Sequence, residues 1–295
     1  MNWRRIRRWA LIALSIFVVV FAGGSWYIAG ELVATANHVV GPPPADLPIE
    51  SMTISSPSGC TLAAWYLPAP QATATVILLH PIRGDRRAML TRARLLYEAG
   101  YSTLLVDLQA HGESSASNVT AGYLERQDVA AAVEFIRARD PEHKLGIIGW
   151  SLGGAATLLA APLPIDALVL ESVYPTITQA VHNSIALRFG PLHHLLAPAL
   201  LIQLQPRLGI SPEQLRPIDF IANVGCPVLV TAGDADEHTT LPETERLYQT
   251  AAEPKKLVIF AGAGHRDLLA HDPEKYENEI VSFLVKHLQQ NGTRD

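Results

Sequence analysis

Residues 145–161 read LGIIGWSLGGAATLLAA and place Ser151 between two unlike segments of the chain. The apolar run before the serine is typical of a buried strand, and the Ala- and Leu-rich run after it is typical of a helix. Gly149 and Gly153 complete the pattern G-x-S-x-G, in which a sharp strand-to-helix turn leaves no room for side chains beside the serine. We therefore predict that Ser151 lies on such a turn, next to a helix N-terminus that favours negative charge.

Eight short apolar runs lie between residues 52 and 260, and from Val76 onward helical stretches separate most of them. Unbroken apolar runs are typical of strands that are covered on both faces. This alternation predicts a doubly wound α/β fold with a mainly parallel, eight-stranded sheet, in which reactive groups gather on loops beyond the carboxyl ends of the strands. The predicted strands span residues 52–56, 61–67, 76–79, 103–106, 145–148, 167–170, 228–230 and 257–260.

The composition excludes several classes of protein. The chain has 295 residues, of which 48% are hydrophobic and 17% charged, which argues against a disordered chain and against a multi-span membrane protein. The formal net charge of -5 argues against a nucleic-acid partner. Two cysteines cannot form a thiolate zinc cluster, and His193-His194 has no carboxylates at metal-ligand spacing. We therefore expect neither a metal nor a cofactor.

The N-terminus carries a membrane-targeting pattern. Four arginines within residues 1–8 precede an uncharged, mostly apolar run from Trp9 to Ala29, which is long enough to cross a bilayer as a helix. Trp26-Tyr27 fits an interfacial aromatic belt. Since no Lys or Arg follows until Arg83, the positive-inside rule predicts a cytoplasmic N-terminus and an extracytoplasmic main domain.

The predicted organisation has three parts. A basic cytoplasmic stub and transmembrane anchor occupy 1–30, a Pro-rich tether follows over 31–51, and the main domain spans 52–290. A secreted protein, cleaved at the small residues Ala34-Thr35-Ala36, is the alternative to the anchor. Apolar, proline-interrupted sequence within about 174–222 predicts a small helical cap that lines a pocket; a helix pair packed on the sheet is the alternative.

A serine hydroxyl is a poor nucleophile unless a base accepts its proton and an acid orients that base. His265 follows the last predicted strand, on a loop that contains Gly262 and Gly264, and is the candidate base. Three carboxylates are candidates for the acid: Asp234 and Asp236 follow the strand 228–230, and Glu171 ends the strand 167–170. The chain thus supplies the order serine, acid, histidine that this strand-to-helix serine motif requires.

On these motifs the chain resembles the α/β-hydrolase superfamily over roughly residues 52–290. Within it the chain is similar to bacterial membrane-anchored serine hydrolases of the serine aminopeptidase-like and dienelactone hydrolase-like branch. The similarity extends to residues 78–87 (LLHPIRGDRR) and 106–114 (VDLQAHGES). The resemblance implies that Asp236, three residues after Gly233, is the acid.

The resemblance also implies an oxyanion hole made by the backbone amides of Ile82 and Leu152. Pro81 stands where the family usually has Gly, but it is not itself one of these two donors. We expect His80 and His111 to anchor their loops by hydrogen bonds rather than to act in catalysis. Arg83, Arg86 and Arg87 are interpreted as solvated surface charge.

The predicted activity is that of a serine hydrolase that cleaves a carboxylic ester through an acyl-enzyme. Its expected substrate is a small molecule or short peptide with an apolar acyl group. The alternatives are an amide or peptide hydrolase and a catalytically silent, membrane-tethered binding module.

Overall fold

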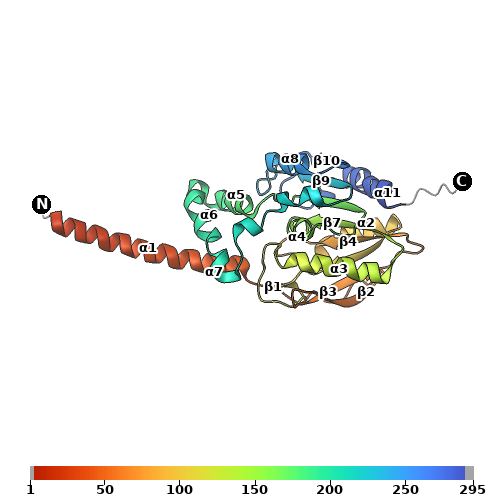
Figure 1. Cartoon of the computed structure of the whole chain (residues 1–295), viewed down its shortest axis with the longest axis horizontal. Helices are drawn as coiled ribbons and strands as arrows, with labels where there is room; N and C mark the ends of the chain where they lie inside the picture. The colour runs from red at the N-terminus through yellow and green to blue at the C-terminus, as the bar shows by residue number, and fades with distance from the viewer. Residues whose placement is uncertain (1–2, 290–295) are drawn as a thin grey trace.

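The computed structural model describes residues 3–289 and shows an α/β domain from which one long helix, α1 (Trp3–Val33), projects (Figure 1). The main sheet has eight strands in the order β10-β9-β8-β7-β4-β5-β3-β2, and only the pairings of β3 with its neighbours are antiparallel. The predicted doubly wound, mainly parallel sheet is confirmed. The strands are β2 (Glu50–Ser55), β3 (Thr61–Leu67), β4 (Ala74–Leu79), β5 (Ser102–Val106), β7 (Lys144–Trp150), β8 (Ala167–Glu171), β9 (Val228–Gly233) and β10 (Lys255–Phe260).

Helices cover both faces of this sheet, which explains the unbroken apolar runs. In β4, Ile77 and Leu79 belong to one buried cluster, whereas Val76 and Leu78 belong to a second cluster on the opposite face. The first cluster includes residues of α3 (Glu125–Arg139), α4 (Leu152–Ala160) and α8 (Leu241–Thr250). The second includes residues of α2 (Leu90–Glu98), α9 (Leu268–His271), α10 (Pro273–Tyr276) and α11 (Ser282–Leu288).

The carboxyl ends of the parallel strands meet at one edge of the sheet. Leu79 of β4 pairs with Gly149 of β7, Gly149 with Leu170 of β8, and Leu170 with Val230 of β9. The loops that leave β4, β7, β9 and β10 therefore begin side by side. These loops carry every residue of the predicted site.

The segment expected to be a tether lies partly against the domain. Its residues β1 (Ala36–Asn37) pair in parallel with β6 (His111–Gly112), and Val40 is buried. The final residues of the expected tether, Glu50 and Ser51, already belong to β2.

The region where a cap is expected contains three helices, α5 (Ile177–Phe189), α6 (His193–Leu201) and α7 (Leu204–Leu208), which lie at the base of α1 (Figure 1) and are called the cap below. Two helical stretches, Trp3–Val33 and Ile177–Leu208, are long and apolar enough to cross a membrane. The second is not one straight helix, because a turn at Gly190-Pro191 separates α5 from α6 and the two helices pack together.

Candidate active site

Ser151 lies on the sharp turn between β7 and α4, with a backbone φ of +49° and ψ of -106°. A positive φ costs a non-glycine residue of the order of 1–3 kcal/mol, so the surrounding packing must hold the turn. A Cβ on Gly149 would lie 2.5 Å from Cα of Gly154, and one on Gly153 would lie 2.5 Å from the carbonyl oxygen of Leu79. The glycines of the G-x-S-x-G motif are therefore required by close backbone contacts.

Asp236 and His265 contact each other across the loops that follow β9 and β10. His265 Nδ1 donates a hydrogen bond of 2.8 Å to Asp236 Oδ2, which is buried. The second carboxylate oxygen, Oδ1, accepts the backbone amides of His238 at 2.9 Å and Thr239 at 2.8 Å. This arrangement holds the imidazole with its proton on Nδ1 and leaves Nε2 to accept a proton.

The pKa of Asp236 reflects two opposing effects. Burial of the carboxyl favours its neutral form, but the hydrogen bonds from His265 and from the amides of Thr239 and His238 outweigh burial. The pKa therefore lies below its ordinary value, and Asp236 is ionised at neutral pH.

Ser151 is not hydrogen-bonded to His265 in this structure, since none of the hydrogen bonds within residues 3–289 involves Ser151 Oγ. The serine is 5% exposed. Contacts between a nucleophile and its base are often long before substrate binds, so the geometry is compatible with a resting site.

The two other candidate acids have different partners. Glu171 accepts hydrogen bonds from Arg92 at 3.2 and 2.6 Å and from the hydroxyl of Tyr276, all within the buried interior. Asp234 is exposed and accepts the amide of Gly262 at 2.7 Å, which ties the loops after β9 and β10 together. Among the described residues, Asp236 alone of the three contacts His265.

The two predicted oxyanion donors lie on adjoining loops. Leu152 is the first residue of α4, where a backbone amide has no acceptor within the helix. Ile82 follows β4 in a turn that is closed by a 3.0 Å hydrogen bond from the amide of Gly84 to the carbonyl of Pro81. The close approach of Gly153 to Leu79 brings the start of α4 against the end of β4.

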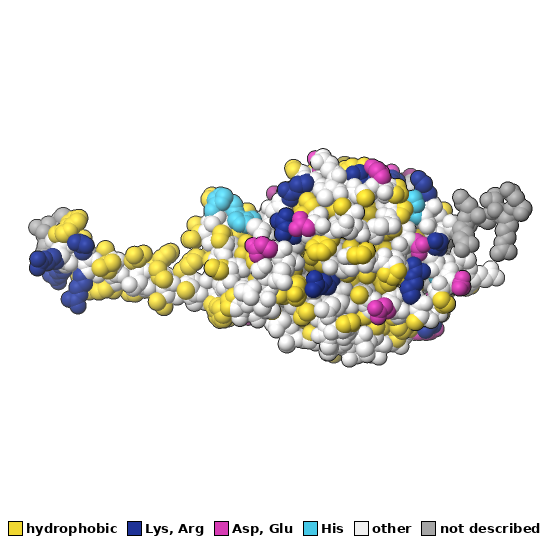
Figure 2. Space-filling model, viewed as in Figure 1, with side chains coloured by type: hydrophobic (Ala, Val, Ile, Leu, Met, Phe, Trp, Pro, Cys, Tyr) yellow, Lys and Arg dark blue, Asp and Glu magenta, His cyan; other side chains and the backbone are white. Residues whose placement is uncertain are grey.

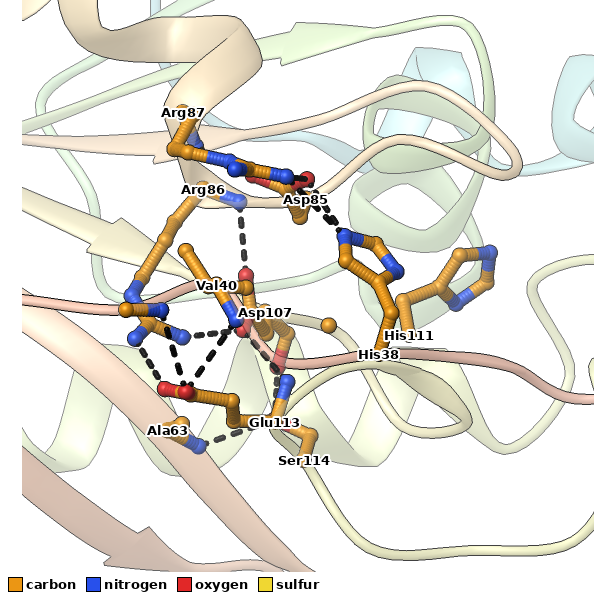
Figure 3. A network of polar contacts seen from close by, with 12 residues as sticks. His38, Val40, Ala63, Asp85, Arg86, Arg87, Asp107, His111, Glu113 and Ser114 are labelled. Carbon is orange, nitrogen blue, oxygen red and sulfur yellow. Dashed lines mark hydrogen bonds and ion pairs between the residues drawn. The ribbon is translucent and has the colours of Figure 1, made fainter.

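A buried carboxylate, Asp107, organises the loop that carries Ile82 (Figure 3). It accepts hydrogen bonds from the amide of Arg86 at 2.6 Å, from the Arg86 guanidinium, and from the amide of Glu113 at 2.9 Å. A Cβ on Gly112 would lie 2.1 Å from this carboxylate, so the His-Gly pair in 106–114 needs the glycine. Arg86 is 3% exposed, which corrects its interpretation as solvated charge.

The same network ties the N-terminal segment to the site. The guanidinium of Arg86 also donates to Glu113, and Glu113 Oε1 accepts the amide of Val40 at 3.1 Å. His38 contacts Asp85 at 2.9 Å, and Asp85 also pairs with Arg87 at 2.8 Å (Figure 3). Residues 38–40 are thereby fixed to the loop of the proposed oxyanion hole.

His80 and His111 hold loops, as expected. His80 accepts the amide of Leu108 at Nε2 at 3.0 Å and donates from Nδ1 to the carbonyl of Pro81 at 2.8 Å. His111 Nδ1 donates to the carbonyl of Gln109 at 2.8 Å. Burial lowers the pKa of each histidine to about 4, so both are neutral at pH 7.

The cap contacts the candidate site through His238, and the sequence alone does not predict this contact. Asn183 of α5 donates to the carbonyl of His238 at 3.1 Å, and Ser184 Oγ lies 3.2 Å from His238 Nδ1. The rings of His238 and His265 are 5.2 Å apart. No sequence pattern links α5 to this loop, because the contact depends on how the cap folds over the sheet.

Residues 3–289 contain no group of three His, Cys, Asp or Glu side chains placed to hold an ion. Cys60 and Cys226 are both free thiols.

The doubly wound, mainly parallel sheet and the strained strand-to-helix turn at Ser151 are typical of one class of α/β proteins. A family model described as "Alpha/beta hydrolase family" matches residues 76–279, more than half of the chain. The chain belongs to this family, and family membership supports hydrolase activity.

Relatives and solved structures agree with this assignment. An uncharacterized protein of Mycobacterium tuberculosis is 30% identical over 80% of this chain and 77% of its own length. An uncharacterized membrane protein of Saccharomyces cerevisiae is 24% identical over 85% of this chain and 84% of its own length. The fold is similar to that of a Pyrococcus furiosus esterase, with a TM-score of 0.72, 22% identity, and coverage of 88% of this chain and 99% of the esterase.

Proposed function

We propose that this protein is a serine hydrolase that cleaves a carboxylic ester with Ser151 as nucleophile, His265 as base and Asp236 as the orienting acid. The observation that carries the proposal is the 2.8 Å hydrogen bond between His265 and the buried Asp236, at the same sheet edge as Ser151 on its strained turn. An imidazole held in this way is the base that a serine hydroxyl requires.

In the proposed reaction, Ser151 Oγ attacks the ester carbonyl while Nε2 of His265 takes the hydroxyl proton. The amides of Ile82 and Leu152 donate to the oxyanion of the tetrahedral intermediate. Collapse of this intermediate breaks the C–O bond, and His265 gives its proton to the leaving alcohol. Water then attacks the acyl-enzyme by the same steps, which releases the acid and restores Ser151.

We infer that α1 anchors the protein in a membrane, with the N-terminus in the cytoplasm and the catalytic domain on the other side. Nearly all side chains of α1 are exposed, including its large apolar ones, and such a surface is unfavourable in water. The four arginines at its start lie at the far end from the domain (Figure 2). This charge distribution supports the stated orientation.

The activity is tested with acyl esters and aminoacyl amides on the full-length protein in detergent micelles, with Ser151→Ala as the matched control. We expect ester turnover by the wild type and none by Ser151→Ala. Turnover of amides but not of esters would show that the bond cleaved is an amide or peptide bond and not an ester. No turnover and no reaction with an active-site phosphonate would instead identify a silent binding module on a hydrolase scaffold.

A further inference from the structure

The hairpin formed by α5 and α6 presents apolar side chains outward. Five large apolar residues on or next to these helices have exposed fractions between 42% and 75%, namely Leu187, Phe189, Leu192, Leu195 and Ile202. Residues 172–212 contain no Asp, Glu or Lys, and their only fully charged side chains are Arg188 and Arg207. Figure 2 shows the hydrophobic surface of α1 continuing onto the domain at this point. We call these five residues the hairpin face.

The hairpin packs along the part of α1 that is proposed to lie in the membrane. Ala29 of α1 joins a buried cluster with Ile185, Ala197 and Leu200. Further toward the N-terminus, Val20 and Phe21 of α1 line a cavity of about 160 Å³ together with Phe189 and Leu196, among others. At about 1.5 Å per residue, Val20 to Ala29 covers roughly 14 Å of the helix axis.

The position of Trp26 sets the depth of these contacts. A tryptophan near the end of a spanning helix lies at the level of the lipid headgroups, and Arg207 places its guanidinium over the Trp26 ring at 3.8 Å. Val20 is six residues before Trp26, which places it about 9 Å deeper in the bilayer. Phe189 and Leu196 line the same cavity as Val20, so they lie at a similar depth in the bilayer.

The hairpin also reaches the proposed active site. Asn183 and Ser184 of α5 contact His238, whose ring lies beside that of His265. Phe189, the last residue of the same helix, lines the cavity beside α1. Six residues, or about 9 Å of helix, therefore separate the catalytic loop from the side chains at membrane depth.

We propose that the α5–α6 hairpin is seated in the outer leaflet beside α1, and that the substrate is the ester of an amphiphile held in that leaflet. The part that concerns substrate rests on the proposed esterase function. The five side chains of the hairpin face are apolar, and the exposed Arg188 and His194 that lie between them in sequence can extend toward the headgroups. Arg207, stacked on the Trp26 ring, adds a positive charge at the proposed headgroup level. An acyl chain in the leaflet would then approach the site along α5 without crossing water.

Whether the hairpin lies in the leaflet is tested by attaching an environment-sensitive fluorophore to a cysteine introduced at Leu192 or at Leu195 of the full-length protein. Val285→Cys is the control. Val285 is exposed on α11, at the end of the domain away from α1 (Figure 1). Burial raises the pKa of Cys60 to about 11 and that of Cys226 to about 12, so both native thiols react slowly at neutral pH. The protein is incorporated into vesicles of phosphatidylcholine and phosphatidylglycerol.

We expect lipids with a nitroxide on the acyl chain to quench the label at positions 192 and 195 and to leave the label at 285 unquenched. Equal quenching at all three positions would show that the hairpin does not lie in the leaflet. A blue-shifted label at 192 and 195 without lipid quenching would show the same, because a second copy of the chain then covers the hairpin face.

The substrate class is tested with the double variant Leu192→Gln/Leu195→Gln, with Val285→Gln as control, on a soluble short-chain ester and on a long-chain ester embedded in vesicles. We expect turnover of the embedded ester to fall at least about tenfold. Moving one leucine side chain from water into the bilayer is favourable by more than the 1.4 kcal/mol that a tenfold change represents. Turnover of the soluble ester should stay at the wild-type level.

Equal turnover of both esters by the double variant and the wild type would overturn the amphiphile as substrate. If the wild type hydrolyses neither ester, the proposed function fails. The quenching measurement does not depend on activity and still decides whether the hairpin is seated in the leaflet.

Discussion

Asp234 and Asp236 are two residues apart and have different partners. Asp236 holds His265, whereas Asp234 accepts a loop amide in solvent. We predict that Asp236→Asn lowers kcat by about 10⁴, the loss that follows when the corresponding carboxylate of a serine protease is changed to an amide. The measurement is kcat on a soluble ester.

Asp234→Asn is the matched control and should retain most of the activity, because only a hydrogen bond between two loops is weakened. Near-wild-type kcat in Asp236→Asn would show that another group orients His265. Besides Asp234, Glu171 is the remaining candidate that the sequence offered.

The buried histidines predict a pH dependence of stability. An unfolded histidine binds a proton near pH 6.5, whereas folded His80 binds one only near pH 4. The unfolded state holds more protons between these values, so the free energy of unfolding falls as the pH is lowered through this window. From pH 6.5 to 5 the loss is about 2 kcal/mol for one such histidine.

We therefore expect His80→Asn to show a smaller loss of stability than the wild type between pH 7 and pH 5, by about 2 kcal/mol. Urea unfolding in detergent micelles at both pH values measures this difference. The exposed His194→Asn serves as control. Parallel pH dependence in wild type and His80→Asn would show that His80 is protonated in the folded protein.

The role of a residue could be predicted from the sequence where its motif requires one particular local backbone geometry. Ser151 falls on the predicted strand-to-helix turn because close contacts require the glycines of its motif. The burial of Arg86 could not be predicted, since its partner Asp107 lies on another loop and is brought close only by the pairing of strands. The assignment of Ser151, Asp236 and His265 as a triad stays a prediction.

At the scale of elements, one buried ion pair joins α2 to the sheet. Arg92 of α2 and Glu171 of β8 are both fully buried, and Tyr276 of α10 completes the cluster. Without Glu171, the buried Arg92 keeps only the partly exposed Asp267, at 3.0 Å, as a charge partner, and a buried charge that loses its main partner is strongly destabilising. We predict that Glu171→Gln lowers the free energy of unfolding by about 3 kcal/mol or more. Tyr276→Phe, which removes only a hydroxyl, should cost about 1 kcal/mol.

Folded Glu171→Gln protein should keep a kcat close to that of the wild type, since Glu171 does not contact His265. Denaturant titration and kcat on a soluble ester check the two halves of this prediction. A stable but inactive Glu171→Gln protein would show that Glu171, at the end of β8, is the acid that orients His265.

Each predicted strand overlaps a strand of the structure, because apolar runs and intervening helices fix the alternation locally. Asp272 and Pro273 likewise mark the start of a helix by local chemistry, with the Asp272 side chain accepting the amide of Lys275 at 3.1 Å. The packing of α5 and α6 on α1 could not be predicted, because apolar composition does not specify the partner.

At the scale of the whole molecule, the helix α1 and the position of its arginines predict the topology. We expect a reporter that is active only outside the cytoplasm to be active when fused to the C-terminus, and a reporter that is active only in the cytoplasm to be inactive. The opposite pattern would reverse the orientation. Mature protein that starts near Asn37 would show that the N-terminal segment is a cleaved signal peptide and not an anchor.

The central claim is that Ser151 is the nucleophile, and mapping a covalent adduct tests it most directly. The full-length protein is treated with an active-site phosphonate, digested, and analysed by mass spectrometry. The proposed mechanism predicts one adduct, on the peptide that contains Ser151, and no adduct in Ser151→Ala. An adduct on another residue, or undiminished labelling of Ser151→Ala, would contradict the mechanism.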